Sequence, residues 1–156
     1  MAHDAAGAVT HPSPPKKGDW PGWLSWANAL PSIAGLCMDM ETMTHGYARA
    51  TVERSIMPLN PNGAVHGGLV AAFADQIGAM ALMPMVGPER TAVTGTLRVE
   101  YLRAALLPLV LEARVERLTR ALVFVRAELS SGGRVCALAS GTWVPLDLAS
   151  LSGAES

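Results

Sequence analysis

A single carboxylate lies in the middle of the most apolar stretch of this chain. Asp75 and Gln76 are the only polar side chains between Gly67 and Val86. On a helix, the same-face neighbours of Asp75 are all small: Ala71, Ala72, Gly78 and Ala79. A carboxylate on a buried helix must be paired, hydrogen-bonded or functional. Because small neighbours leave room for an approaching group, Asp75 is either catalytic or a buried aspartate capped by a hydroxyl of the facing sheet.

The start of the same predicted helix supplies a second chemical element. His66-Gly67-Gly68 follows a loop dense in proline, asparagine and glycine. A helix N-terminus offers unpaired backbone N–H groups and the positive end of the helix dipole. Such donors can bind a phosphate or stabilise the oxyanion of acyl transfer, and glycine lets a ligand approach them closely. The two glycines could also serve only the turn.

The spacing of these two elements predicts a dimer. Gly67 and Asp75 are eight residues apart in the sequence, or about 12 Å along a helix. An oxyanion donor and a base or nucleophile must both lie within about 3 Å of one reacting centre. Two antiparallel copies of the helix, side by side, bring the start of one to the middle of the other. If both groups act on one substrate, the active site is shared between subunits.

The elements that must position these groups form one domain, expected over residues 20–145. Residues 1–19 are expected to be a flexible tail and residues 146–156 a polar C-terminal tail. Tryptophans at every third position predict an N-terminal helix over residues 20–32. That helix either packs on the domain or lies as a lid over an apolar ligand site. The long helix, 67–83, is expected to be buried and to stop at a proline.

The rest of the chain is predicted to be strand. Two strands lie between Leu36 and Met57, and four more follow the helix in hairpin succession. Those four are 91–102, 109–118, 122–129 and 135–144, with Ser130-Ser131-Gly132-Gly133 as a four-residue hairpin loop. An antiparallel sheet of about six strands must curl around the helix to bury it. The fold class is therefore α+β, with one central helix.

The composition excludes several classes of protein. A hydrophobic content of 50% is too high for a disordered chain, and a net charge of -1 gives no basic field for nucleic acid. Two cysteines are too few for a disulfide scaffold. Asp75 interrupts the apolar run, which argues against a membrane span, and Met1 to Asp19 lacks the apolar core of a signal peptide. We therefore expect a cytoplasmic protein without nucleic-acid or membrane partners.

One longer motif resembles a known family. Residues 60–68 read Asn-Pro-Asn-Gly-Ala-Val-His-Gly-Gly, Asp75 follows the histidine by nine residues, and Thr94 and residues 97–103 fit the same pattern. The ensemble resembles the hotdog-fold acyl-CoA thioesterases of the phenylacetate-degradation (PaaI-like) and thioesterase superfamily member type, over about residues 36–144. The resemblance implies a curved antiparallel sheet wrapped around one long helix, an acyl-CoA substrate, and a homodimer or homotetramer.

The resemblance also implies roles for individual residues. Asp75 would activate water as a general base or attack the thioester itself, and the sequence leaves both open. The backbone N–H of Gly67 from the partner subunit would hold the oxyanion. Asn60 and His66 would line the thioester and position the water, carbonyl or leaving sulfur, although each could simply organise the turn. Thr94 would hydrogen-bond the water or Asp75.

Substrate contacts outside the reacting centre are assigned to Gly68, Arg103 and Arg120. The two arginines stand at predicted strand ends where the phosphates of coenzyme A could reach, although solvated strand faces explain them equally well. No spacing of histidine, cysteine or acidic residues resembles a zinc site, and thioester hydrolysis needs no metal or other cofactor. Alternatives are a hotdog dehydratase or hydratase and a non-catalytic acyl-CoA-binding protein.

Overall fold

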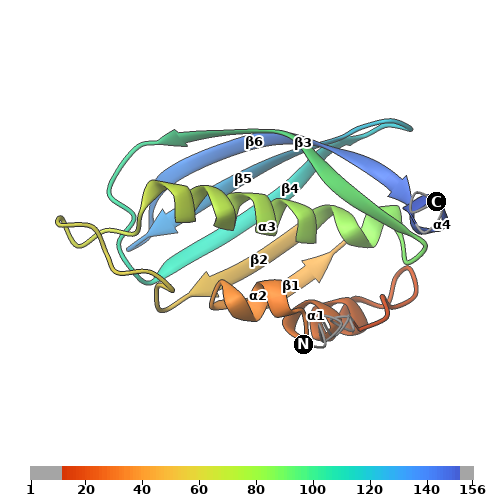
Figure 1. The fold of residues 1–156 in the computed structure, drawn as a ribbon, viewed down its shortest axis with the longest axis horizontal. Helices are drawn as coiled ribbons and strands as arrows, with labels where there is room; N and C mark the ends of the chain where they lie inside the picture. Colours follow the sequence, from red (N-terminus) through yellow and green to blue (C-terminus); the bar gives the residue numbers. More distant parts are fainter. Residues whose placement is uncertain (1–11, 152–156) are drawn as a thin grey trace, which may run out of the picture.

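The computed structural model describes residues 12–151, so the predictions for residues 1–11 and 152–156 lie outside it (Figure 1). Four helices and six strands follow one another in this part of the chain. In order they are α1 (Trp20–Asn28), α2 (Pro31–Gly35), β1 (Met38–Thr44), β2 (Tyr47–Val52), α3 (Gly67–Val86), β3 (Arg90–Tyr101), β4 (Leu109–Leu118), β5 (Val123–Ser131), β6 (Arg134–Asp147) and α4 (Leu148–Leu151).

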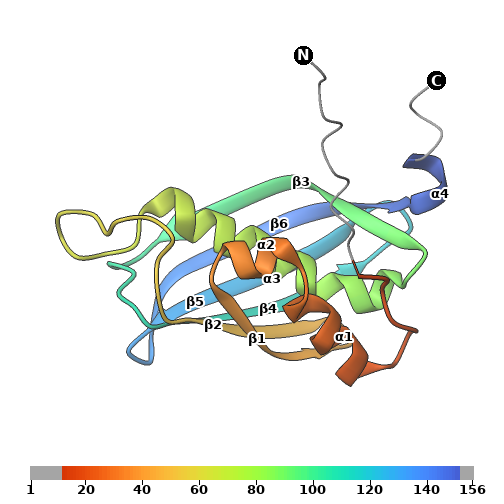
Figure 2. The ribbon, with the colours of Figure 1, turned by 60° about the horizontal axis from the view of Figure 1, so that its bottom comes forward.

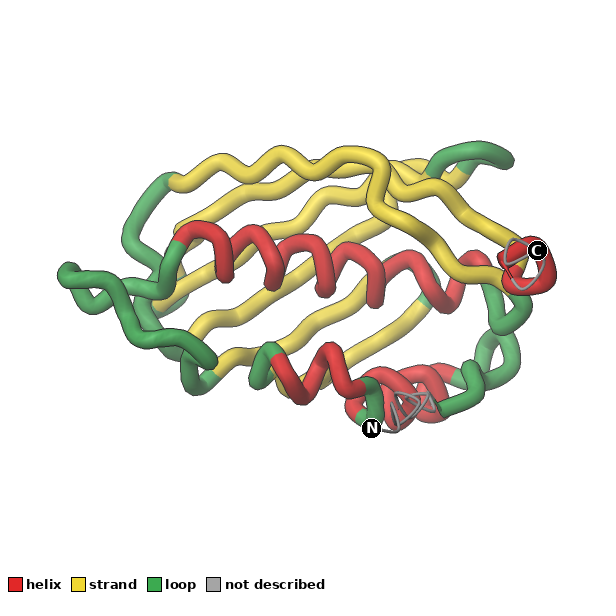
Figure 3. Tube along the Cα trace, viewed as in Figure 1, coloured by secondary structure: helices red, strands yellow, loops and turns green. Residues whose placement is uncertain are grey.

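All six strands form one antiparallel sheet in the order β1-β2-β4-β5-β6-β3. The sheet curves around α3, which runs across its concave face (Figures 1 and 3). Strand β5 shows why: Val123, Val125, Ala127 and Leu129 are buried, whereas the residues between them are exposed. Alternation with a period of two gives the sheet one apolar face to cover the helix. The predicted α+β fold with a central helix is confirmed.

Helix α3 is buried along most of its length because nearly every side chain on it is apolar. Phe73 and Ile77 are fully buried against the sheet. By length and composition alone α3 could cross a membrane, but a core helix passes the same test, and 61% of its most apolar window is buried. The helix runs through Pro84, which was predicted to stop it, and ends at Gly87 with φ of 88°. That left-handed conformation suits glycine.

The strand pairing differs from a simple succession of hairpins. Strand β3 pairs with β6 and not with β4, so it forms an edge of the sheet. Residues 102–108 carry the chain from that edge to the middle of the sheet, where β4 pairs with β2 and β5. The hairpin between β5 and β6 is also tighter than predicted. Ser131 pairs with Arg134, so only Gly132 and Gly133 turn the chain, and both have positive φ.

The two ends of the predicted domain also need correction. The helix predicted over residues 20–32 is two helices, because the chain leaves the first at Ala29 and Pro31 begins α2. Both pack next to β1 (Figure 2). Trp23 and Ile33 join the core shared with α3. At the other end, residues 146–151 are not an irregular tail, since β6 extends to Asp147 and α4 follows it.

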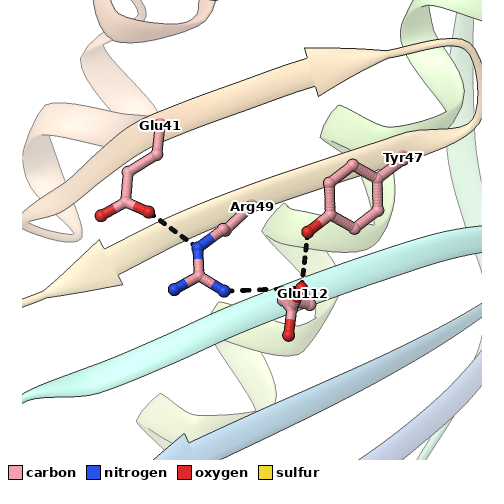
Figure 4. A network of polar contacts seen from close by, with 4 residues as sticks. All are labelled: Glu41, Tyr47, Arg49 and Glu112. Carbon is pink, nitrogen blue, oxygen red and sulfur yellow. Dashed lines mark hydrogen bonds and ion pairs between the residues drawn. The ribbon is translucent and has the colours of Figure 1, made fainter.

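A polar network lies on the face of the sheet that points away from α3 (Figure 4). Arg49 on β2 forms ion pairs with Glu41 at 2.8 Å and Glu112 at 3.5 Å, and Tyr47 donates a hydrogen bond to Glu112 at 2.5 Å. Burial, followed by the hydrogen bond to Glu112, raises the pKa of Tyr47 above its ordinary value. The network links β1, β2 and β4 on the solvent-facing side of the sheet.

Candidate active site

The side chain of Asp75 lies where α3 meets the edge strand β3. The Thr94 hydroxyl donates a hydrogen bond to Oδ1 of Asp75 at 2.7 Å. Thr94 is exposed and Asp75 is half-buried, so this pair is accessible from solvent in the single chain. Within residues 12–151, no group donates to the second carboxylate oxygen, Oδ2. A hydroxyl from the sheet therefore caps one oxygen of Asp75 and leaves the other available for chemistry.

One of the small residues around Asp75 makes room for another side chain of the protein. A Cβ on Gly78 would lie 2.8 Å from the ring of Trp143, so this glycine makes room for a tryptophan and not for a ligand. Trp143 is buried and is the cross-strand partner of Thr94. The indole thus packs between α3 and the sheet next to Asp75 and sets the distance between them. The other small neighbours, Ala71, Ala72 and Ala79, are half-buried.

The start of α3 presents unpaired donors, as expected. His66 is the N-cap residue, with φ of -60° and ψ of 140°, and its carbonyl accepts from the N–H groups of Leu69 and Val70 at 3.0 Å. Its imidazole makes no capping hydrogen bond, so a capping role for the side chain is excluded. The N–H groups of Gly67 and Gly68 have no acceptor in the described part of the chain. These two amides are free donors at the positive end of the helix dipole.

Asn60 organises the loop before the helix. Its carboxamide oxygen accepts hydrogen bonds from the N–H groups of Asn62 and Ala64, both at 3.0 Å. Its own N–H donates to the Ala64 carbonyl at 2.8 Å. An asparagine that bonds the backbone two residues on is the usual start of such a turn. The side-chain oxygen is thus occupied by the loop, and only the amide nitrogen of Asn60 remains for a ligand.

One residue at the helix start was not among the predicted site residues. The hydroxyl of Tyr101 donates a hydrogen bond to the Gly67 carbonyl at 2.7 Å, and its ring lies 3.4 Å from where a Cβ of Gly67 would stand. Tyr101, Gly67, Asn60 and Arg103 are among the residues that line a hollow of about 340 Å³. The signal was present, because Tyr101 stands in the 97–103 segment, but nothing in the sequence placed the end of β3 against the helix start.

The structure separates the two arginines assigned to coenzyme A. Arg103 lies at the same end of the sheet as the start of α3, where its guanidinium donates to the Val135 carbonyl at 3.5 Å. Arg120 lies in the turn between β4 and β5, at the opposite end (Figure 1). The hollow at the helix start therefore includes Arg103, while Arg120 has no place in it.

The Gly67 amide and the Asp75 carboxylate do not meet within one chain. Gly67 begins α3, and Asp75 lies two turns further along the same helix. Cys136 offers no alternative nucleophile: it is buried, its thiol donates to the Leu129 carbonyl at 3.2 Å, and burial raises the pKa of the thiol. Because the thiolate is the reactive form, this cysteine is inert.

A curved antiparallel sheet around a single long helix is the hotdog fold, and this chain is a hotdog protein. Residues 62–137 match the sequence model of the Thioesterase superfamily. That segment runs from the loop before α3 into β6 and includes Gly67, Asp75, Thr94 and Tyr101. The chain is thus a hotdog protein, and the match over residues 62–137, just under half of its length, agrees with the resemblance to the thioesterases of the PaaI-like type. No curated protein sequence matches it.

Solved structures agree with the hotdog fold. The chain is 29% identical to a phenylacetic acid degradation-related protein of Ralstonia eutropha JMP134, with a TM-score of 0.68 over 74% of this chain and 90% of that one. The PaaI protein of E. coli, from the phenylacetic acid degradation operon, is 21% identical, with a TM-score of 0.69 over 78% and 88%. A hypothetical thioesterase protein of Streptococcus pneumoniae TIGR4, solved with coenzyme A, is 22% identical, with a TM-score of 0.64 over 70% and 86%. At 21% and 22% identity, the likeness to the last two structures concerns the fold alone.

Proposed function

We propose that this protein is an acyl-CoA thioesterase, which hydrolyses a coenzyme A thioester to a carboxylate and a free thiol. The observation that carries the proposal is the hydrogen bond between Thr94 and Asp75, which leaves one carboxylate oxygen open on an accessible helix face. The superfamily match supports thioester hydrolysis as the reaction type. Coenzyme A bound to the streptococcal protein supports coenzyme A as the thiol part of the substrate. No cofactor is needed for this reaction.

The reaction can proceed by either of two routes through Asp75. As a general base, the carboxylate takes a proton from water while the water oxygen bonds to the thioester carbon; the tetrahedral intermediate then collapses, the C–S bond breaks, and the proton returns to the leaving sulfur. As a nucleophile, the carboxylate bonds to that carbon and expels the thiolate, and water then hydrolyses the mixed anhydride. On both routes Thr94 holds the carboxylate in place, and negative charge develops on the carbonyl oxygen.

We propose further that the N–H group which receives this charge comes from Gly67 of a second subunit. The 12-residue edge strand β3 supports this arrangement, because it pairs with β6 on one side only. Its central residues are exposed in the single chain, including the apolar Val93 at 47%. A long edge strand with exposed apolar residues is a template for pairing with another chain. Pairing there would bring a second copy next to Asp75, which also lies at β3.

Thiol release from acyl-CoA by wild type and the Asp75→Asn variant tests the proposed function. The variant keeps the shape of the side chain and its contact with Thr94 but loses the base and nucleophile, so we expect kcat to fall by at least about 100-fold. Thermal unfolding of both proteins shows whether the fold is kept. Near-normal turnover by the variant would refute the role of Asp75, and acyl-CoA binding by wild type without thiol release would make the protein a binding module.

Hydrolysis in heavy-oxygen water distinguishes the two routes. In a single turnover with enzyme in excess, the nucleophile route places a solvent oxygen on the Asp75 carboxylate whenever water attacks the aspartyl carbon of the anhydride. The general-base route never labels the enzyme, since the solvent oxygen goes only to the released acid. Mass spectrometry of the peptide that contains Asp75 reads the result.

A further inference from the structure

An apolar groove lies beside the proposed reaction centre, between α3 and the N-terminal part of the chain. Its volume is about 480 Å³, within the range of small-molecule sites. Six apolar residues form much of its surface: Trp26, Leu30, Ala79, Met83, Ala92 and Leu148. They come from both ends of the described chain as well as from α3 and β3. Of the two interpretations of the N-terminal helix, the structure shows that it packs on the domain, and Trp26 of that helix also lines this groove.

The groove lies next to the Asp75 site, although neither Asp75 nor Thr94 lines it. Ala79 stands one helical turn after Asp75, on the same side of α3, and Gln76 next to Asp75 is a lining residue. On the strand side, Ala92 lies two residues before Thr94 on β3. One end of the groove is thus set by the two elements that form the Asp75–Thr94 hydrogen bond. From there it follows α3 away from the helix start.

The N-terminal wall of the groove is held in place by specific contacts. The indole N–H of Trp26 donates to the Pro12 carbonyl at 2.8 Å, which anchors the segment before α1 across the groove. Trp26 also packs edge-on against the fully buried Trp23, with ring centroids 5.2 Å apart. Leu30, between the two short helices, is buried. This wall is therefore preformed, and it limits the width of the groove opposite Ala79.

The chemistry of the lining excludes a phosphate or nucleotide as its occupant. Arg90 is the only charged residue that lines the groove within residues 12–151, and its Nε lies 3.0 Å from a carboxylate oxygen of Asp147. That ion pair offsets the one positive charge, so the groove offers mainly van der Waals contact and apolar burial. The occupant must be uncharged and apolar.

We infer that the groove binds the acyl chain of the substrate, and that the N-terminal residues which line it, among them Trp26 and Leu30, determine which chain fits. This inference rests on the proposed thioesterase function. From Gln76 to Met83 the groove spans eight residues of α3, which is seven helical rises or about 10 Å. A length of that order suits an unbranched aliphatic chain of medium length, such as octanoyl. Acetyl would leave the groove empty, and palmitoyl would extend beyond it.

The test is a profile of kcat/KM across acetyl-, hexanoyl-, octanoyl-, palmitoyl- and phenylacetyl-CoA. For wild type we expect an increase of up to about fourfold for each methylene buried, ending near octanoyl. Ala79→Phe fills the groove next to Asp75 and should lower the octanoyl-to-acetyl ratio at least about tenfold. Ala79→Leu is a smaller change in the same direction. Trp26→Ala widens the groove and should move the optimum to longer chains.

Trp20→Ala is the matched control, since Trp20 lies on the same helix outside the groove, where its ring contacts His45. Its profile should match that of wild type. A flat profile for wild type, or an equal loss on all substrates in Ala79→Phe, overturns the inference. So does a change of oligomeric state in Ala79→Phe with an unchanged profile, because the groove would then be covered by a second copy.

A binding measurement keeps this inference separate from the proposed function. Calorimetry on Asp75→Asn compares octanoyl-CoA with free coenzyme A, and a groove that holds the chain should make octanoyl-CoA bind at least about tenfold more tightly. If wild type hydrolyses no thioester while this preference holds and Ala79→Phe abolishes it, the groove is an acyl site on a protein without thioesterase activity. Equal affinity for both ligands refutes the groove whatever the activity.

Discussion

The N–H of Gly67 can be removed without disturbing the helix that carries it. Gly67 is the first helical residue after the N-cap, the position where proline is best tolerated. His66 before it has ψ of 140°, in the extended region that a following proline requires. The Gly67 N–H donates to no acceptor in the described part of the chain, so Gly67→Pro breaks no hydrogen bond there. The variant should therefore fold.

The magnitude follows from the role assigned to this amide. Loss of one oxyanion donor costs about 100- to 1000-fold in kcat. Gly67→Ala is the control, because it adds a Cβ, which would meet the Tyr101 ring at 3.4 Å, an ordinary contact distance, but keeps the N–H. The ratio of kcat for the alanine and proline variants then isolates the N–H from the added bulk. Thiol release with saturating acyl-CoA is the assay, and urea unfolding checks the fold. If the two variants turn over at similar rates, the Gly67 amide does not hold the oxyanion.

Three further predictions follow from single contacts. Thr94→Val removes the donor to Asp75 and should lower kcat/KM about tenfold, whereas Thr94→Ser keeps the hydroxyl and should retain most of the wild-type kcat/KM. Equal activity of the valine and serine variants would contradict the role of the hydroxyl. Gly78→Ala would place a Cβ 2.8 Å from Trp143 and should be less stable in urea by about 1–3 kcal/mol than Gly68→Ala, whose Cβ meets nothing within 4 Å; equal stability would show that the indole moves aside. Because the pKa of Tyr47 is raised in the folded chain, its contribution to stability is complete below pH 10.0 and is lost as the pH rises through the folded pKa. The free energy of unfolding of Tyr47→Phe should therefore fall less at alkaline pH than that of wild type. Identical dependence of this free energy on pH in the two proteins would refute the prediction.

The local elements near the site could be read from the sequence because local patterns specify them. The apolar run after His66 predicts a buried helix, and alternation predicts strand 109–118 with the bounds that β4 has. Pro84 misled the prediction of the helix end. Pro84 lacks the N–H that would bond the Met80 carbonyl, but the turn after it still closes, because the Gly87 N–H bonds the Met83 carbonyl at 3.0 Å.

The long-range contacts could not be read in the same way. Pairing of β3 with β6 depends on how the whole sheet closes around α3, and no local pattern encodes it. That pairing brings Trp143 next to Thr94, and so explains Gly78, which from the sequence alone indicated space for a ligand. It also brings Tyr101 to the start of the helix. The sequence singled out Asp75 and Gly67 by residue type, but not the aromatic residues that hold them in place.

Activity recovered by mixing two inactive variants tests the shared site most directly. In a heterodimer of Asp75→Asn and Gly67→Pro subunits, one composite site carries both changes and the other carries neither. After complete subunit exchange of equal amounts, half of the dimers are mixed and each has one intact site, so activity should return to about a quarter of wild type. No recovery after exchange has been demonstrated by mass spectrometry would mean that Asp75 and Gly67 do not meet across a subunit interface.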